Sequence, residues 1–246
     1  MPKSKANETR QQRVDERLDE ALSESFPASD PISIYTEAIA DNPNIYANVT
    51  PEHHHSMKYK VGYFVGSLAS TSINRRLANA LVRLAPEELE FEEIPIRNLS
   101  LYSSDYDGDY PPEAQALKSA IARSHAILFV TPEYNRSIPG GLKNAIDWGS
   151  RPWGKNSFAR KPSAVIGTSP GSIGTAVAQQ SLRSVLSFLN APQMNSPEAY
   201  ITFTPDLITE DGTVTNASTE EFLRNYMAEF HDFIAKVLTV LPPEGP

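Results

Sequence analysis

The sequence predicts an α/β protein with one doubly wound parallel sheet of five strands and helices on both faces. Two patterns support this prediction. From Met57 onward, short apolar runs alternate with segments whose apolar residues recur at helical spacing. The run Ala126–Val130 is apolar at every position, which is typical of a strand that is buried on both faces. The pattern leaves open which of the two common doubly wound strand orders is present.

Each predicted strand leads into a predicted helix. The strands are expected over Lys58–Val65, Leu89–Ile96, Ala126–Val130, Ser163–Gly167 and Ala199–Phe203. The helices are expected over Asn74–Leu84, Pro112–Ser124, Gly141–Ser150, Thr175–Leu189 and Glu220–Val240. In the first helix, for example, Leu77, Leu81 and Leu84 share one face. Folds of this kind bind ligands where the strands end, so the loops after strands one, three and four are the expected place for a site.

Composition excludes several classes of protein. The 246 residues include no cysteine, which excludes disulfides, zinc–thiolate sites, iron–sulfur clusters and a catalytic thiol. Thirty acidic and 22 basic residues give a formal charge of −8. Nucleic-acid binding depends on clustered Lys and Arg, so this charge balance argues against it. No apolar run reaches the roughly 18 residues of a membrane span, and the N-terminus lacks the apolar core of a signal peptide. We therefore expect a cytoplasmic protein without a membrane or nucleic-acid partner.

Residues 1–56 are predicted to form an acidic, largely disordered extension of one domain over residues 57–241. They hold ten acidic and five basic residues, five prolines and no glycine. Such a segment buries too little apolar surface to offset its ordering entropy. A short amphipathic helix is expected over residues 10–24, and residues 10–31 are the candidate contact for a protein partner; a solvated helix that binds nothing is the alternative. The run His53–His55 is interpreted as a solvated linker, so no metal site is predicted.

The loop after the first strand, Gly66–Asn74, is rich in hydroxyl groups. It matches neither G-x-G-x-x-G nor G-x-x-x-x-G-K-[ST]. Four Ser or Thr residues and one Asn stand where the chain enters a helix, and a helix N-terminus offers unpaired N–H groups and a positive dipole end. A terminal phosphate group fits this chemistry. Simple capping of the helix by Ser72 or Asn74 is the alternative.

Two further polar loops follow strands three and four. Thr131–Asn135 is a proline-bounded turn with an aromatic ring and an amide, which suits a flat heteroaromatic ligand. The adjacent Gly140 and Gly141 then permit close approach of the backbone at a helix start. Thr168–Gly174 is again short, polar and glycine-bearing. Three such loops at three strand ends predict one pocket.

These motifs resemble the NADPH-dependent FMN reductase family, in particular its chromate/quinone reductase and azoreductase-like branch. The resemblance rests on GSLASTSIN at 66–74, TPEYN at 131–135, PGGLKNAIDW at 139–148 and TSPGSIGTAVAQQSLRSVL at 168–186. It implies a flavodoxin-like fold with strand order 2-1-3-4-5 and one non-covalently bound FMN per subunit. It also implies NADPH or NADH as co-substrate, and a homodimer or homotetramer.

The resemblance also assigns roles to individual residues. The expected FMN ligands are Ser67, Ser72 and Asn74 for the phosphate, Pro132, Glu133, Tyr134 and Asn135 for the isoalloxazine and ribityl chain, and Thr168, Ser169 and Gly171 for the other edge of the ring. No catalytic side chain is named, because flavin N5 carries the chemistry. This branch commonly has Arg at the position of Ala69, so the phosphate lacks its usual cation. Arg75 or Arg76 replaces it only if the helix start turns one of them inward.

The predicted function is that of an FMN-dependent NAD(P)H oxidoreductase acting by a ping-pong hydride mechanism. Quinones, azo compounds, chromate and free flavin are the candidate acceptors, and the sequence does not choose among them. Two alternatives remain open: a flavodoxin-type electron carrier, and a reductase that residues 1–56 tether to a partner assembly. Trp153, in the loop 151–160, is a candidate to complete the site of a neighbouring subunit.

Overall fold

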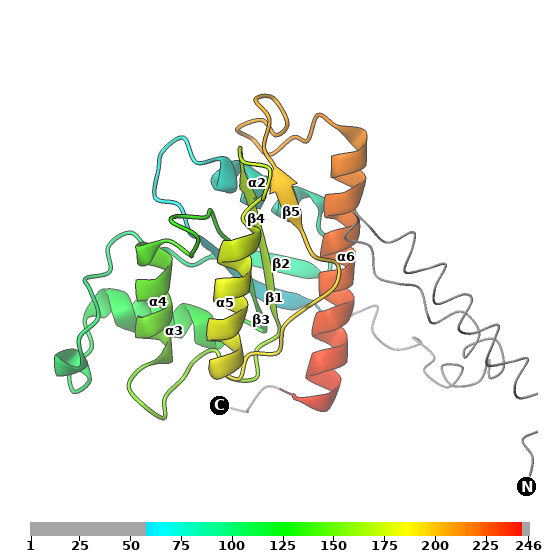
Figure 1. The fold of residues 1–246 in the computed structure, drawn as a ribbon. Coiled ribbons are helices and arrows are strands. Elements are labelled where there is room, and N and C mark those ends of the chain that lie inside the picture. Colours follow the sequence, from blue (N-terminus) through cyan, green and yellow to red (C-terminus); the bar gives the residue numbers. More distant parts are fainter. Residues whose placement is uncertain (1–57, 243–246) are drawn as a thin grey trace, which may run out of the picture. The chain divides into compact units, whose positions relative to one another are not determined.

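The computed structural model describes residues 58–242 and shows a five-stranded parallel sheet with the order β2-β1-β3-β4-β5 (Figure 1). The strands are β1 Tyr59–Val65, β2 Leu89–Glu93, β3 Ala126–Val130, β4 Ser163–Ser169 and β5 Tyr200–Thr202. The α-helices are α2 Ile73–Leu84, α3 Pro112–Arg123, α4 Gly140–Ser150, α5 Ala176–Phe188 and α6 Ala217–Val240; Ser104–Tyr106 forms a 3₁₀ turn. The predicted α/β class and the flavodoxin-like strand order are confirmed.

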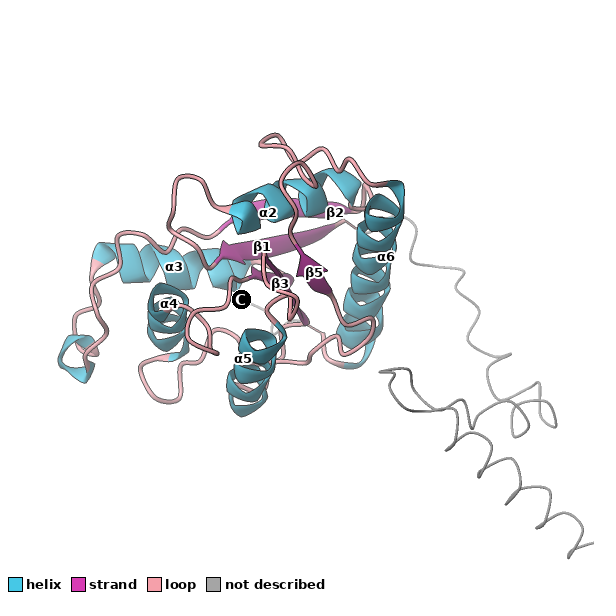
Figure 2. Cartoon of the chain, turned by 45° about the horizontal axis from the view of Figure 1, so that its top comes forward, coloured by secondary structure: helices cyan, strands magenta, loops and turns pink. Residues whose placement is uncertain are grey.

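Helices cover both faces of the sheet. α2 and α6 lie on one face, and α3, α4 and α5 lie on the other (Figure 2). Side chains of the central strands alternate between these layers. In β3, Leu128 and Val130 pack with α2 and α6, whereas Ile127 and Phe129 pack with the other three helices. Every residue of β3 is buried, as its uninterrupted apolar run predicts.

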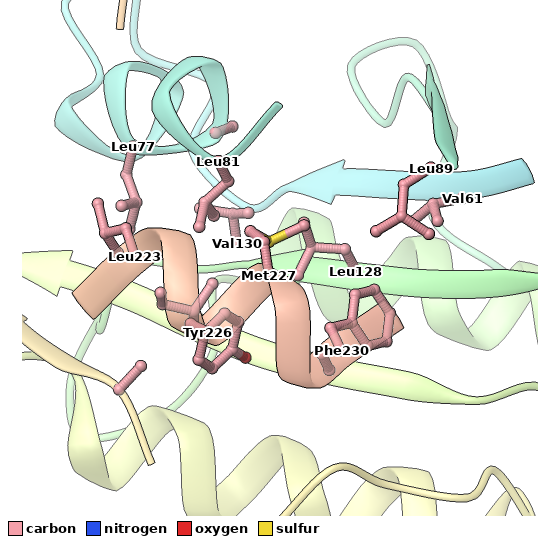
Figure 3. Close-up of a cluster of buried hydrophobic side chains, with 14 of the residues drawn as sticks. Val61, Leu77, Leu81, Leu89, Leu128, Val130, Leu223, Tyr226, Met227 and Phe230 are labelled. Carbon is pink, nitrogen blue, oxygen red and sulfur yellow. The ribbon is translucent and has the colours of Figure 1, made fainter. Parts of the chain in front are cut away.

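The layer that includes α2 and α6 forms one apolar core (Figure 3). Leu77 and Leu81 of α2 belong to the same cluster as Phe230 of α6. Tyr226 is buried there too, and its hydroxyl donates a hydrogen bond of 2.9 Å to the Val165 carbonyl oxygen. Burial raises the pKa of Tyr226 well above its usual value, so this phenol stays a donor.

Two element boundaries differ from the sequence prediction by three residues, and the others differ by two or fewer. β2 ends at Glu93, three residues early, because Pro95 has no N–H group with which to continue the ladder. α6 begins three residues early, at Ala217. The Asn216 side chain caps it by accepting a hydrogen bond of 3.0 Å from the Thr219 N–H.

Residues 1–56, including the helix predicted over residues 10–24 and the run His53–His55, lie outside the described residues. The expectations for that segment and the predicted domain boundaries therefore stay predictions. Between residues 58 and 242, no helix combines the length and the apolar character that a bilayer crossing requires. The same residues contain no group of three or more His, Asp or Glu side chains arranged to hold a metal ion.

Candidate functional site

The three loops singled out in the sequence begin side by side at the carboxyl edge of the sheet. The Gly66 N–H donates a hydrogen bond of 2.8 Å to the Val130 oxygen, and the Thr131 N–H donates one of 3.0 Å to the Ile166 oxygen. Gly167 permits this close approach, since a Cβ there would lie 2.1 Å from the Thr131 oxygen. The loops after β1, β3 and β4 therefore leave the sheet together, at the edge where folds of this kind bind ligands.

The loop after β1 ends in a helix start that leaves donors unused. Ser72 is the N-cap of α2, and its hydroxyl accepts a hydrogen bond of 3.2 Å from the Arg75 N–H. No acceptor among residues 58–242 binds the N–H groups of Ile73 and Asn74, and the first turn has no acidic residue. Ser67 and Ser72 are both buried. Free N–H donors, buried hydroxyls and a positive dipole end together suit a phosphate group.

Asn74 connects the first loop to the end of β4. Its side chain is buried; its Nδ2 donates a hydrogen bond of 2.9 Å to the Thr168 oxygen, and its Oδ1 accepts one of 3.0 Å from the Thr168 N–H. Thr168 Oγ1 in turn donates to the Ile201 oxygen of β5 at 2.9 Å. These two predicted cofactor ligands hold the loops together in the structure, and their direct contact with FMN stays a prediction.

The loop after β3 contains a tight two-residue hairpin. Tyr134 and Ser137 exchange backbone hydrogen bonds of 2.9 and 3.0 Å. The residues between them, Asn135 and Arg136, both have positive φ, 52° and 62°. Positive φ at both central positions is the pattern of a type I′ turn, which asparagine tolerates well. The turn presents the half-exposed Tyr134 ring at the carboxyl edge.

Glu133 attaches this hairpin to the start of α5. Its Oε2 accepts hydrogen bonds of 3.1 Å from the N–H groups of both Val177 and Ala178. Thr175, the N-cap residue of that helix, has φ 72° and makes no capping hydrogen bond, so the carboxylate of Glu133 caps the helix instead. Arg136 pairs with the other carboxylate oxygen at 3.4 Å. The negative charge of Glu133 is therefore already paired with the start of α5 and with Arg136.

The loop after β4 keeps two of the predicted ligands accessible. Ser169 Oγ accepts a hydrogen bond of 2.9 Å from the Gly171 N–H, and Gly171 is exposed. Gly174 has φ 55°, and a Cβ there would lie 2.7 Å from the Tyr200 carbonyl carbon, so the chain can turn back toward the sheet only with glycine. This turn leaves Ser169 and Gly171 at the carboxyl edge, as the resemblance implies.

Two glycines open the start of α4, beside the first loop. A Cβ on Gly140 would meet no atom within 4 Å, and one on Gly141 would meet only Leu68 Cδ1, at 3.7 Å. Neither glycine has a positive φ. Packing and backbone geometry therefore do not require glycine here, although glycine is a poor helix former. The open space fits a ligand that lies against the helix start.

Two side chains of the segment PGGLKNAIDW anchor a connection that the sequence analysis did not single out. Asn144 Nδ2 and Trp148 Nε1 both donate to the Ser100 oxygen, at 2.9 and 2.7 Å. Asn144 Oδ1 also accepts a hydrogen bond of 2.9 Å from the Tyr102 N–H. The segment thus fixes the connection between β2 and α3.

Comparison with known proteins identifies the family. Residues 59–206 match the family model described as NADPH-dependent FMN reductase. The chain belongs to this family. It is 47% identical over 174 residues to a 2-hydroxy-1,4-benzoquinone reductase from Burkholderia sp., covering 71% of this chain and 95% of that protein. It is 44% identical over 180 residues to a quinone reductase from Pseudomonas putida, covering 73% and 96%.

A solved structure supports the same conclusion. FerB, described as a flavoenzyme NAD(P)H:(acceptor) oxidoreductase from Paracoccus denitrificans, is 45% identical and superimposes with a TM-score of 0.70, covering 72% of this chain and 98% of FerB. The predicted family, enzyme class and cofactors are confirmed: the chain is an FMN-dependent NAD(P)H oxidoreductase. Its residues fit the cofactor, because the start of α2 suits the phosphate and the space over Gly140 suits a flat ring.

The structure places all the predicted site residues at one edge of the sheet, in the three loops, in the first turn of α2 (Asn74) or at the end of β4 (Thr168 and Ser169). Asn74, Glu133 and Thr168 use their polar groups to join those loops to each other. The sequence analysis missed Arg97, whose guanidinium donates a hydrogen bond to the Leu68 oxygen in the first loop. No local motif marks this arginine, since the contact joins residues 29 positions apart.

Proposed function

We propose that this FMN reductase family member is an NAD(P)H:quinone oxidoreductase. The observation that carries the proposal is the 47% identity to a 2-hydroxy-1,4-benzoquinone reductase over 95% of that protein's length. The accessible edge described above agrees with it. A half-exposed Tyr134 ring and an uncrowded start of α4 leave room for a flat aromatic substrate beside the cofactor.

Each loop contributes a different part of the binding. Ser67, Ser72 and the free N–H groups at the start of α2 hold the phosphate. Residues 132–135 and 168–171 flank the ring system. Asn74 and Glu133 keep these loops at a fixed separation through their hydrogen bonds to Thr168 and to the start of α5. The main role of the protein is therefore to bind and orient the cofactor.

When bound, FMN would supply the hydride chemistry of its N5 atom between NADPH or NADH and the acceptor, so the two substrates would use the site in turn. The loops contribute backbone N–H groups to the edge of the ring, where fixed donors act most strongly if water is excluded. No nucleophilic side chain is needed. Quinones are the proposed acceptors, and azo compounds, chromate and free flavin are the further candidates.

The test is an anaerobic reaction of the purified holoprotein with NADPH and, separately, with NADH. We expect the visible absorbance of the flavin to be lost without any added protein, and to return when 1,4-benzoquinone is added. A flavodoxin-type carrier needs a protein donor, so a flavin that stays oxidised with both nucleotides would contradict the proposal. Turnover with an azo dye, chromate and free FMN, measured beside benzoquinone, ranks the acceptors.

We also propose a homodimer or homotetramer. Trp153 and Phe188 are 77% and 70% exposed, and their rings lie 6.5 Å apart, which suits a contact between copies. Trp153 follows the C-terminus of α4, the end opposite the three loops, so it reaches a cofactor only in a neighbouring subunit. Sedimentation and NADPH turnover of Trp153→Ala test this. A monomeric wild-type protein, or a variant unchanged in both measurements, would contradict it. A cytoplasmic location stays a prediction.

A further inference from the structure

The loop after β1 holds a phosphate group without a cation of its own. Residues 66–74 contain no Lys or Arg. A phosphate monoester carries a charge of about −1.5 to −2 near neutral pH. Backbone N–H groups and hydroxyls bind such a group, and a guanidinium strengthens the binding because its hydrogen bonds are charge-assisted. A cation for this loop has to come from a neighbouring segment.

The two arginines at the start of α2 are already paired. Arg75 forms a two-pronged ion pair with Glu93 at the end of β2, with Nη2 and Oε1 2.7 Å apart. Arg76 pairs with Glu210 at 3.3 Å. Because a carboxylate faces each guanidinium, neither arginine adds an uncompensated positive charge to the phosphate loop.

Arg97 approaches the loop from the connection between β2 and α3. Its Nη2 donates a hydrogen bond to the Leu68 oxygen. Arg97 also lines a cavity of about 410 Å³ together with four loop residues, Ser67, Leu68, Ala69 and Ser70. Among residues 58–242, no carboxylate forms an ion pair with Arg97, in contrast to Arg75. Its positive charge is therefore available at the loop.

The backbone of Arg97 is fixed beside the loop. Ile94 and Ile96, which are 1% and 6% exposed, pack into the core formed with α3, α4 and α5. Arg97 is the next residue and is exposed. Three residues further on, the Ser100 oxygen accepts the hydrogen bond from Trp148 Nε1. Arg97 thus extends from a segment held on both sides, which reduces the entropy cost of keeping its guanidinium at the loop.

We propose that Arg97 is the cation of the FMN phosphate site, taking the place of an arginine within the loop. The inference rests on the proposed function, since it requires the loop to hold FMN. The short side chain of Ala69 leaves the cavity open to a guanidinium from the neighbouring connection. Arg97 then fixes the loop through the Leu68 oxygen and stabilises the phosphate through its charge.

The test compares FMN with riboflavin, which has the same ring system and no phosphate, as ligands of the apoprotein. Arg97→Gln keeps an N–H donor for the Leu68 oxygen but removes the charge, whereas Arg97→Lys keeps the charge. We expect R97Q to raise the Kd of FMN about tenfold and that of riboflavin less than about twofold, while R97K keeps most of the FMN affinity. Quenching of flavin fluorescence measures both constants. The effect on FMN should shrink as salt is added.

Arg224→Gln is the matched control, because it removes the same charge from an exposed pair with Glu220 on α6. It should leave both constants unchanged. Equal losses for FMN and riboflavin in R97Q would assign Arg97 a purely structural role, and an unchanged FMN affinity would remove it from the site; either result overturns the proposal. A failure of the proposed function is distinguishable, since it would appear in the wild type as weak binding of both flavins or as no reaction with NADPH.

Discussion

α2 and α5 begin at the same edge of the sheet but treat negative charge in opposite ways. α2 is capped by the neutral Ser72, has no acidic residue in its first turn and leaves N–H groups unpaired among the described residues. α5 has an N-cap residue, Thr175, that makes no capping hydrogen bond, and the Glu133 carboxylate binds its first turn. A helix start therefore predicts an anion site only where the protein has not supplied the anion itself.

We propose that this difference separates the sites for the two halves of the cofactor. The phosphate needs donors and a positive field, which the start of α2 retains. The ring needs a flat, fixed boundary, and the Glu133 cap provides it by attaching the Tyr134 hairpin to α5. Ser137 adds a second attachment, since its Oγ lies 2.9 Å from Ser181 Oγ in α5.

The largest effect is expected from making α2 resemble α5. Aspartate is a good N-cap residue, so Ser72→Asp should leave the apoprotein as stable as the wild type. Its carboxylate would lie next to the place proposed for the phosphate. Two charges about 4 Å apart near a protein surface interact by about 4 kcal/mol, so we expect FMN affinity to fall at least about 100-fold.

FMN titration and thermal unfolding of the apoprotein check this prediction. Ser218→Asp, which adds the same charge near the start of α6, is the control and should bind FMN normally. If S72D bound FMN as tightly as the wild type, the phosphate would not lie at the start of α2.

The second prediction removes the cap of α5. Glu133→Ala leaves the N–H groups of Val177 and Ala178 without their acceptor, and we expect a loss of about 2 kcal/mol in the free energy of unfolding. Glu133→Gln keeps one acceptor oxygen and should lose about half as much. Urea unfolding of the apoproteins measures both. Glu113→Ala is the control, because Glu113 lies in the first turn of α3 without a capping hydrogen bond. Equal effects at Glu133 and Glu113 would mean that the cap contributes nothing.

The smallest effect is expected at the C-terminus of α4, which is the negative end of the helix dipole. The Lys118 ammonium donates hydrogen bonds to the Gly149, Arg151 and Lys155 oxygens, at 3.1, 2.6 and 2.7 Å, where α4 ends. Burial lowers the pKa of Lys118 to about 8, and the nearby charge of Lys155 adds to this. The unfolded chain therefore binds this proton more tightly than the folded protein, so the contribution of Lys118 to stability increases as the pH rises from about 8 to the unfolded value of 10.5.

The substitution Lys118→Met removes the ammonium group that titrates. The unfolding free energy of the wild type, relative to this variant, should rise between about pH 7 and about pH 10, by less than about 1 kcal/mol because Lys118 is only half-buried. Urea unfolding at the two pH values measures the change. A difference that falls with pH would show that the loss of a donor outweighs the relief of desolvation.

The sequence predicted the class of fold and the edge that carries the site, because both follow from local patterns. The alternation of apolar runs with helical spacing defines the strands and helices, and parallel strands bring their loops to one edge. The strand order came from the resemblance alone. The roles of Glu133 and Arg97 were beyond such reasoning, since their partners lie 44 and 29 positions away and depend on tertiary packing. Asn74 shows the same limit, with its partner 94 positions away.

The chain of hydrogen bonds from Asn74 through Thr168 to Ile201 has a consequence for the order of events during synthesis. The first loop emerges from the ribosome long before β4 and β5, so the hydrogen bonds between Asn74 and Thr168 that tie the start of α2 to β4 cannot form until those strands follow. We therefore expect the nascent protein to remain unable to capture flavin until nearly the whole sheet has been translated. Loading of the cofactor then reports that the polypeptide is complete through its last strand.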